Sequence, residues 1–202
     1  MAGRGPVAAL FAPLLPAGAR FATRAIEGDA PPLFPEEEAA VAKAFDRRRR
    51  PFAFGRACAR EALGTAVAIA VGPNRQPIWP PGIAGSITHT DEHAAAAVIE
   101  THRSLGIDLE SLAHAAQTPD LLAMVATSAE RAAFAHEHLA ALVFSAKESV
   151  YKCVYPVIGR FLDFHDVELH FDEAGFVTRI DGVAVHGRFA IDDTHVATVA
   201  VC

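Results

Sequence analysis

Residues 104–110, SLGIDLE, have the apolar pattern of a buried strand but carry two carboxylates two positions apart. Side chains at i and i+2 of a strand point to the same face, so Asp108 and Glu110 stand side by side. Like charges at this spacing repel each other, and burying them without a partner is costly. This face of the strand is therefore expected either to reach solvent or to meet positive charge.

Composition limits the class of protein to which such a strand can belong. The chain has 202 residues, of which 51% are hydrophobic and 21% charged, so it can bury a core as one large domain or two small ones. A formal net charge of -6 argues against general affinity for nucleic acid or anionic membrane. Three widely spaced cysteines form neither a disulfide framework nor a zinc motif, which predicts a reduced, cytoplasmic compartment.

Local patterns predict a mixed α+β chain. The early chain, residues 7–35, reads as loops with a strand or two. Helices are expected at residues 35–45, 52–63 with a stop at Gly64, over most of 113–138, and at 139–156 with a stop at Pro156. Strands are expected at residues 94–100, 104–110, 167–171, 176–180, 185–191 and 195–201. A turn at residues 101–103 predicts that the first two strands pair as an antiparallel hairpin. No run of residues is apolar and long enough to predict a membrane span or a signal-peptide core.

The helix expected at residues 139–156 carries a second group of charges. Its core stripe is Val143, Ala146, Val150 and Val154, at helical spacing. Glu148 and Lys152, at i and i+4, lie on the opposite side, and Lys147 is turned by about 100° from Glu148.

Each charged group on its own has an ordinary interpretation. Glu148 and Lys152 suit a solvated helix-surface ion pair, and Asp108 and Glu110 suit a strand end that reaches solvent. Together the three acids could meet at one point, where Mg²⁺ would cancel their repulsion and leave positions for phosphate oxygens. The lysines suit a phosphate as well. Other candidate donors, each commonly structural or merely solvated, are Ser86, Thr88, His89, Arg75 and the arginines at 47–50.

Several motifs, in this order and spacing, resemble the 4'-phosphopantetheinyl transferases. They are RRRRPFAFGRACAREAL, GPNRQPIWPPGIAGSITH, GSITHTDEHAAAAV, SLGIDLE and FSAKESVYKCVYP. The resemblance runs from about residue 47 to 156 and is greatest to the branch that serves siderophore and other secondary-metabolite synthases, the enterobactin-synthetase-component-D-like enzymes. A tryptophan often found before the K-E lysine is Phe144 here. The resemblance implies two similar α+β halves related by a pseudo-twofold, at residues 1–103 and 104–202, with the active site at their interface.

The resemblance also implies what the site residues do. Asp108, Glu110 and Glu148 would ligate Mg²⁺, with Mn²⁺ as an alternative, on the pyrophosphate of coenzyme A. Catalysis would rest on Asp108, on Glu148 as the base that takes the proton from a serine of an apo carrier protein, and on Lys152, which would stabilise the leaving phosphate. Coenzyme A would be bound at its pyrophosphate by Lys147 and Lys152. Its adenosine phosphates would be held by Arg48, Arg56, Arg75, Thr88 and His89. The product would be adenosine 3',5'-bisphosphate.

Two other functions remain open from the residues: a Mg²⁺-dependent nuclease and a non-catalytic module that binds coenzyme A or a carrier protein. Against the nuclease, the lysine precedes the third acid on a helix and the net charge is -6. The expected partners of a transferase are coenzyme A and an acyl, peptidyl or aryl carrier protein, with no nucleic acid and no membrane insertion. A monomer is expected, since the two halves already form a pseudo-dimer. Leu121 and exposed Met124 are predicted to form part of the carrier-docking surface.

Overall fold

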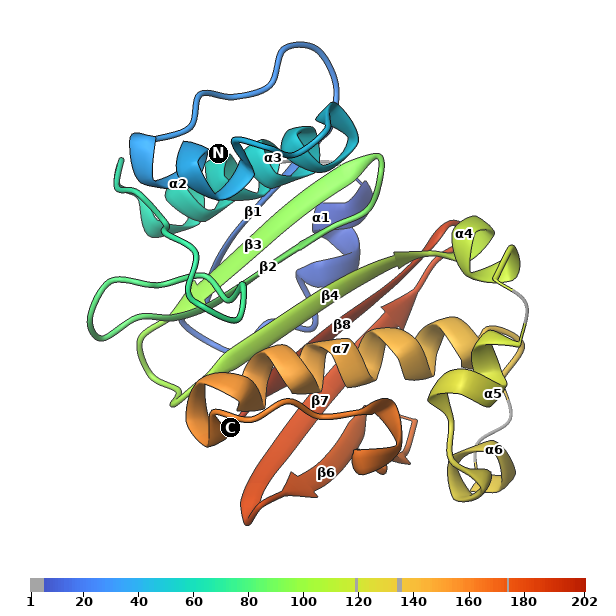
Figure 1. Ribbon diagram of the computed structural model, residues 1–202. Helices are drawn as coiled ribbons and strands as arrows, with labels where there is room; N and C mark the ends of the chain where they lie inside the picture. The colour runs from blue at the N-terminus through green and yellow to red at the C-terminus, as the bar shows by residue number, and fades with distance from the viewer. Residues whose placement is uncertain (1–5, 119, 134–135, 174) are drawn as a thin grey trace.

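The computed structural model describes residues 6–118, 120–133, 136–173 and 175–202, which form two antiparallel sheets with helices packed on them (Figure 1). All three cysteines are free. In the described part of the chain no helix is both long and apolar enough to cross a membrane.

The first sheet has three strands in the order β1-β3-β2: β1 (Arg20–Ala25), β2 (Ala84–His89) and β3 (His93–Ile99). Helix α3 (Asp46–Leu63) covers one face, and α2 (Pro35–Val41) lies beside it (Figure 1). The central strand β3 is rich in alanine and is buried on both faces. Alanine fits there because its small side chain lets α3 approach the sheet from one side and the second half from the other.

The second sheet has five strands in the order β4-β8-β7-β6-β5: β4 (Leu105–Ser111), β5 (His170–Phe171), β6 (Phe176–Ile180), β7 (Val183–Ile191) and β8 (His195–Val201). The long helix α7 (Leu139–Ile158) lies across it (Figure 1). The predicted core stripe of this helix is confirmed, since Val143, Ala146, Val150 and Val154 are fully buried. Short helices α4 (Leu112–Ala116), α5 (Leu121–Val125) and α6 (Ser128–Ala133) join β4 to α7, and a 3₁₀ turn, η1 (Phe164–Asp166), follows α7.

The two halves repeat one plan. In the second half, β4-β8-β7 with α7 corresponds to β1-β3-β2 with α3 in the first. A buried glutamate occupies the same place in each. Glu37 at the start of α2 accepts from Arg60 of α3 and from the backbone N–H of Ile69. Glu130 of α6 accepts from Lys147 of α7 and from the backbone N–H of Leu169. The repeated buried ion pair supports the expected pair of similar α+β halves.

The packing crosses between the halves. Helix α1 (Pro6–Phe11), absent from the sequence expectation, packs against β8 and buries Val7, Leu10 and Phe11 in an apolar cluster that also contains residues of β4. The division at residues 103 and 104 therefore remains a prediction about the chain's organisation.

The predicted hairpin between residues 94–100 and 104–110 is wrong. Strand β4 pairs with β8 over its whole length instead of with β3. The other edge of β4 is met by side chains of β2: Ser86 Oγ accepts from the N–H of Ile107 at 3.0 Å, and Thr88 Oγ1 accepts from the N–H of Leu109 at 3.2 Å. The backbone groups of β4 therefore form hydrogen bonds on both edges, with the backbone of β8 on one edge and with side chains of β2 on the other. Strand β4 thus belongs to the second sheet and contacts the first.

The predicted end of the long helix at Pro156 is also wrong. Helix α7 continues to Ile158 and ends at Gly159, which has the left-handed φ of 69°. The predicted stop at Gly64 after α3 is confirmed by the same cap geometry, with a φ of 71°.

Candidate active site

Helix α7 lies directly against β4 because Gly106 has no side chain. A Cβ atom at this position would lie 1.9 Å from the carbonyl oxygen of Ser149. The close approach places Glu148 and Lys152 of α7 beside the acidic face of β4, while Ile107 and Leu109 point to the opposite, apolar face.

Asp108 is the centre of this cluster and is only 3% exposed. Its Oδ1 accepts from Lys152 Nζ at 2.6 Å and from Thr88 Oγ1 at 3.1 Å. Its Oδ2 is buried without a hydrogen-bond partner among the described residues. Buried carboxylate oxygens are normally satisfied, so this oxygen is suited to bind a cation.

The cluster places three carboxyl groups around one ammonium, which disfavours ionisation of all three acids at once. Burial, reinforced by the Asp108 carboxylate, raises the pKa of Glu110 to about 8. Burial also raises the pKa of Glu148, and Lys152 opposes that rise. For Lys152 burial favours the neutral amine, but the carboxylates of Asp108 and Glu148 outweigh it and raise the pKa.

The chemistry of the donor set therefore fits a hard divalent cation, although the ligand oxygens of the three acids do not all lie within 4.8 Å of one another in the described structure. Asp108, Glu110 and Glu148 supply only carboxylate oxygens, and the free Oδ2 of Asp108 faces no competing donor in the described part of the chain. Lys152 forms an ion pair with the other oxygen, Oδ1. Its positive charge reduces the repulsion that the sequence predicts between Asp108 and Glu110.

The other predicted coenzyme A contacts are distributed unevenly. Thr88 is buried and holds Asp108 and the backbone of β4. His89 is exposed at the end of β2, and Arg48 is exposed near the start of α3. Arg56 is 5% exposed; its Nε donates to the carbonyl of Ile69 at 2.8 Å, and its guanidinium stacks 4.2 Å from the centre of the Phe52 ring. Burial lowers the pKa of Arg56 to about 10.

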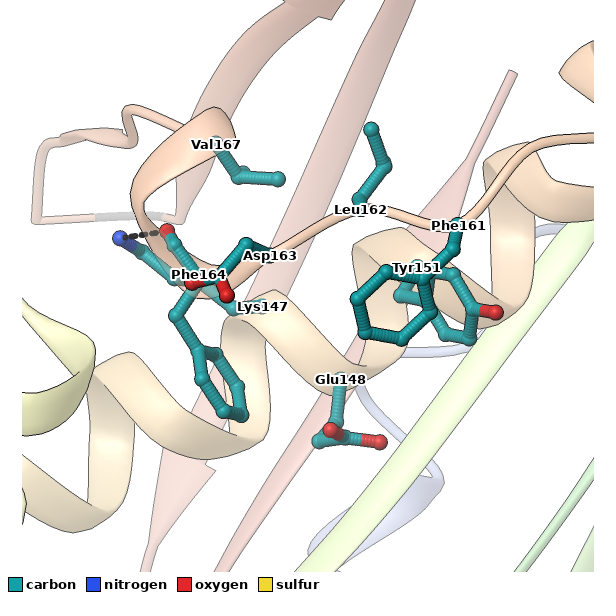
Figure 2. Close-up of a pocket in the computed structure, with 8 residues that line it drawn as sticks. All are labelled: Lys147, Glu148, Tyr151, Phe161, Leu162, Asp163, Phe164 and Val167. Carbon is teal, nitrogen blue, oxygen red and sulfur yellow. Dashed lines mark hydrogen bonds between the residues drawn. The ribbon is translucent and has the colours of Figure 1, made fainter.

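The structure does not bring Lys147 to the acids. Figure 2 shows Lys147 and Glu148 leaving α7 on different sides. The ammonium of Lys147 donates to Glu130 at 2.9 Å and to the carbonyl of Phe164 at 2.8 Å, and its side chain is 1% exposed. These contacts favour a structural role over the predicted contact with pyrophosphate.

Two adjoining pockets follow the exposed side of α7. The first, of about 200 Å³, is lined by Glu148 and, across it, by Leu162 and Asp163 of the segment after α7 (Figure 2). The second, of about 440 Å³, is lined by Arg75 of the first half and by Tyr155 and Gly159 of the second. Tyr151 and Phe161 line both pockets.

Sequence reasoning missed several residues of this region. Tyr151 and Phe161 had only the general signal of an aromatic residue, although Phe161 is 73% exposed. Glu130 has a stronger sequence signal, because Thr127 and Glu130 have the spacing of a helix capping box.

The two residues predicted for carrier docking differ in exposure. Met124 is 58% exposed, as predicted. Leu121 packs in part against the apolar cluster of Val125, Leu139 and Val143, so it contributes to the protein's own core.

The sequence matches known proteins along most of its length. The model of the 4'-phosphopantetheinyl transferase N-terminal domain matches residues 36–99, and that of the 4'-phosphopantetheinyl transferase superfamily matches residues 104–200. The 4'-phosphopantetheinyl transferase Svp of Streptomyces mobaraensis is 42% identical over 175 residues, which are 77% of this chain and 70% of that protein. The chain belongs to the 4'-phosphopantetheinyl transferase superfamily.

Two further relatives show the same kinship. The 4'-phosphopantetheinyl transferase Npt of Nocardia iowensis is 38% identical over 79% of this chain and 75% of its own length. Enterobactin synthase component D of Salmonella typhi is 33% identical over 52% of this chain and 48% of its own length. The superfamily model, which matches residues 104–200, covers the acidic cluster on β4 and α7.

Proposed function

We propose that this transferase moves the 4'-phosphopantetheine arm of coenzyme A onto a serine of an apo carrier protein. The observation that carries the proposal is the convergence of Asp108, Glu110, Glu148 and Lys152 where α7 crosses β4, with a pocket beside Glu148. The relatives named for enterobactin synthesis support carriers of siderophore, nonribosomal peptide or polyketide assembly. We propose a cytoplasmic monomer.

In the proposed reaction the serine hydroxyl attacks the pyrophosphate phosphorus that bears the pantetheine arm. A bond forms between the serine oxygen and this phosphorus, and the bond to the bridging oxygen breaks, which releases adenosine 3',5'-bisphosphate. Glu148 accepts the serine proton, and the burial that raises its pKa makes it a stronger base. Lys152, held by Asp108 with its side chain 27% exposed, stabilises the negative charge on the leaving phosphate.

Asp108, Glu110 and Glu148 would hold Mg²⁺, or Mn²⁺ in its place. When bound, the ion would neutralise the pyrophosphate and the acids together. Thr88 contributes by fixing Asp108 from the first half of the protein, so the orientation of this carboxylate depends on both halves.

The adenosine end of coenzyme A would lie toward the larger pocket. Arg75 lines this pocket, and Asn74 beside it donates to the Tyr155 hydroxyl. Exposed Arg48 and His89 would meet phosphate oxygens at the rim. Arg56 could take part only through the edge of its guanidinium that Ile69 does not occupy.

The transfer assay tests the proposed function. The protein is incubated with coenzyme A, Mg²⁺ and an apo peptidyl carrier protein, and the carrier is analysed by intact mass. We expect the carrier to gain one phosphopantetheine group at its serine, with one adenosine 3',5'-bisphosphate released. Carriers from several siderophore, peptide and polyketide systems that all stay unmodified, while an active relative modifies them, would contradict the proposal.

Metal removal should stop the reaction. Treatment with excess chelator is expected to abolish turnover, and added Mg²⁺ should restore it, because the acids would otherwise repel the pyrophosphate. Asp108→Asn should not be restored by the same Mg²⁺ concentration. Full activity of the parent in excess chelator would rule out the metal role.

Arg48→Ala should weaken binding of coenzyme A by about 10- to 150-fold, which corresponds to the loss of a charge-assisted hydrogen bond. Binding of dephospho-coenzyme A should change much less if Arg48 contacts the 3'-phosphate. The matched control is Arg49→Ala, since Arg49 is already paired with Glu38. Calorimetry measures the affinities of the parent and both variants for the two ligands, and equal weakening of both ligands by Arg48→Ala would exclude the 3'-phosphate contact.

A further inference from the structure

A second cluster of metal-ligating side chains lies apart from the acidic residues of β4 and α7. It consists of Glu92 and His93, at the β2–β3 turn, and His195, the first residue of β8. Their ligand atoms all lie within 4.8 Å of one another, and among the described residues only this group of three or more reaches that spacing. Two ligands come from the first half and one from the second, so the cluster bridges them.

The pseudo-symmetry of the fold explains how the two histidines meet. Strand β8 lies between β4 and β7 as β3 lies between β1 and β2, and each begins with a histidine after a hairpin turn. The rings of His93 and His195 face each other edge to face, with centroids 5.3 Å apart and an interplanar angle of 87°.

The buried nitrogens of these rings point to a ligand. His195 is 6% exposed, and its Nε2 is buried without a hydrogen-bond partner in the described structure. The Nδ1 of His93 is in the same condition. Buried polar atoms are nearly always paired, because leaving one unpaired costs free energy, so two unpaired nitrogens on neighbouring rings are unusual.

The neighbouring hydrogen bonds set the protonation of His195. Thr194 Oγ1 donates its proton to the Asp192 carboxylate at 2.8 Å, and it lies 2.8 Å from Nδ1 of His195. A hydroxyl has one proton, so this oxygen must accept from Nδ1–H. The proton of the neutral ring is then on Nδ1, and Nε2 presents a lone pair, as in histidines that bind metals.

We propose that Glu92, His93 and His195 bind a divalent transition metal ion of the zinc class, which ties the β2–β3 turn to β8. Two imidazoles and one carboxylate suit Zn²⁺, Co²⁺ or Ni²⁺ and do not suit Mg²⁺, which prefers oxygen. Ligand atoms of a tetrahedral zinc site lie roughly 3.4 Å apart, so the cluster must contract slightly. Glu92 is exposed, so its carboxylate is free to move toward the two histidines. The inference does not depend on the proposed transferase reaction.

Zinc binding is tested by thermal unfolding of untagged, metal-free protein in the presence of Mg²⁺. ZnCl₂ at roughly 100 times its dissociation constant should raise the melting temperature by about 5–10 °C, since ligand binding to the folded state stabilises it. Co²⁺ should give the visible absorption of a tetrahedral site.

Variants distinguish this site from the acids. His93→Gln and His195→Gln should each lose the zinc shift and the cobalt absorption, and Glu92→Gln should weaken both. Exposed His186 provides the matched control, because His186→Gln should keep both signals. If His195→Gln does not fold, His93→Gln still tests the site, because His93 is partly exposed. Either the absence of any zinc response in the parent, or a response that persists in His93→Gln but disappears in Glu110→Gln, would overturn the proposal.

Discussion

Glu148→Gln is expected to reduce turnover by about two to four orders of magnitude, the usual contribution of a general base. The amide has nearly the shape of the carboxylate, but it cannot accept the proton of the carrier serine. Coenzyme A should still bind, because Lys152 and the basic residues of the first half are unchanged. Rates measured at saturating coenzyme A and Mg²⁺, together with calorimetric binding of coenzyme A, separate the two effects.

The control for this variant is Glu100→Gln, which removes an exposed carboxylate that pairs with Arg20 and does not belong to the acidic cluster. Its turnover should equal that of the parent. Turnover in Glu148→Gln within tenfold of the parent would remove Glu148 from the mechanism. A proportional loss of coenzyme A affinity would instead indicate that this carboxylate acts chiefly through the bound metal.

Glu130→Ala should lower the free energy of unfolding by about 3–5 kcal/mol, the range for breaking one side of a buried ion pair. The Lys147 ammonium would remain buried with only the carbonyl of Phe164 as a partner, and the backbone N–H groups of Thr127 and Leu169 would lose theirs. Chemical denaturation measures the change. Glu100→Ala, which breaks the exposed pair with Arg20, should cost less than about 1 kcal/mol.

The same ion pair decides the role of Lys147. Lys147→Met should be destabilised about as much as Glu130→Ala, and joining Lys147→Met with Glu130→Leu should restore much of the lost stability, because no buried charge remains unpaired. The double variant should bind coenzyme A like the parent if Lys147 is structural. A stable Lys147→Met protein with weakened coenzyme A binding would restore the predicted pyrophosphate contact.

Local chemistry made much of the fold predictable. The buried face of a helix repeats about every 3.6 residues, and this period in residues 139–156 predicts α7. The buried face of a strand repeats every 2 residues, and the alternation after residue 167 predicts strands β5 to β8. Short-range signals were weaker guides to helix ends. Pro156 lies inside α7, where packing against the sheet outweighs the loss of one backbone hydrogen bond.

The acids and Lys152 were found as candidates from the sequence, but their partners were not. Lys152 donates to Asp108 because Gly106 lets α7 approach β4 closely. The spacing of residues along α7 does not by itself predict this contact. Thr88 looked like a phosphate donor and proved to hold Asp108, since its role depends on β2 lying beside β4. Lys147 looked like a second phosphate contact, although only the fold places Glu130 beside it.

The sequence by itself determined the kinds of elements, the acidic strand and the helix that faces it, because each depends on residues close together in the chain. The tertiary structure alone decided which strands pair and which charges meet, because those contacts join residues that are distant in sequence. The pairing of β4 with β8 and the meeting of His93 with His195 are of this second kind. Both arise when two similar halves pack together and bury a shared core, and no local pattern encodes that packing.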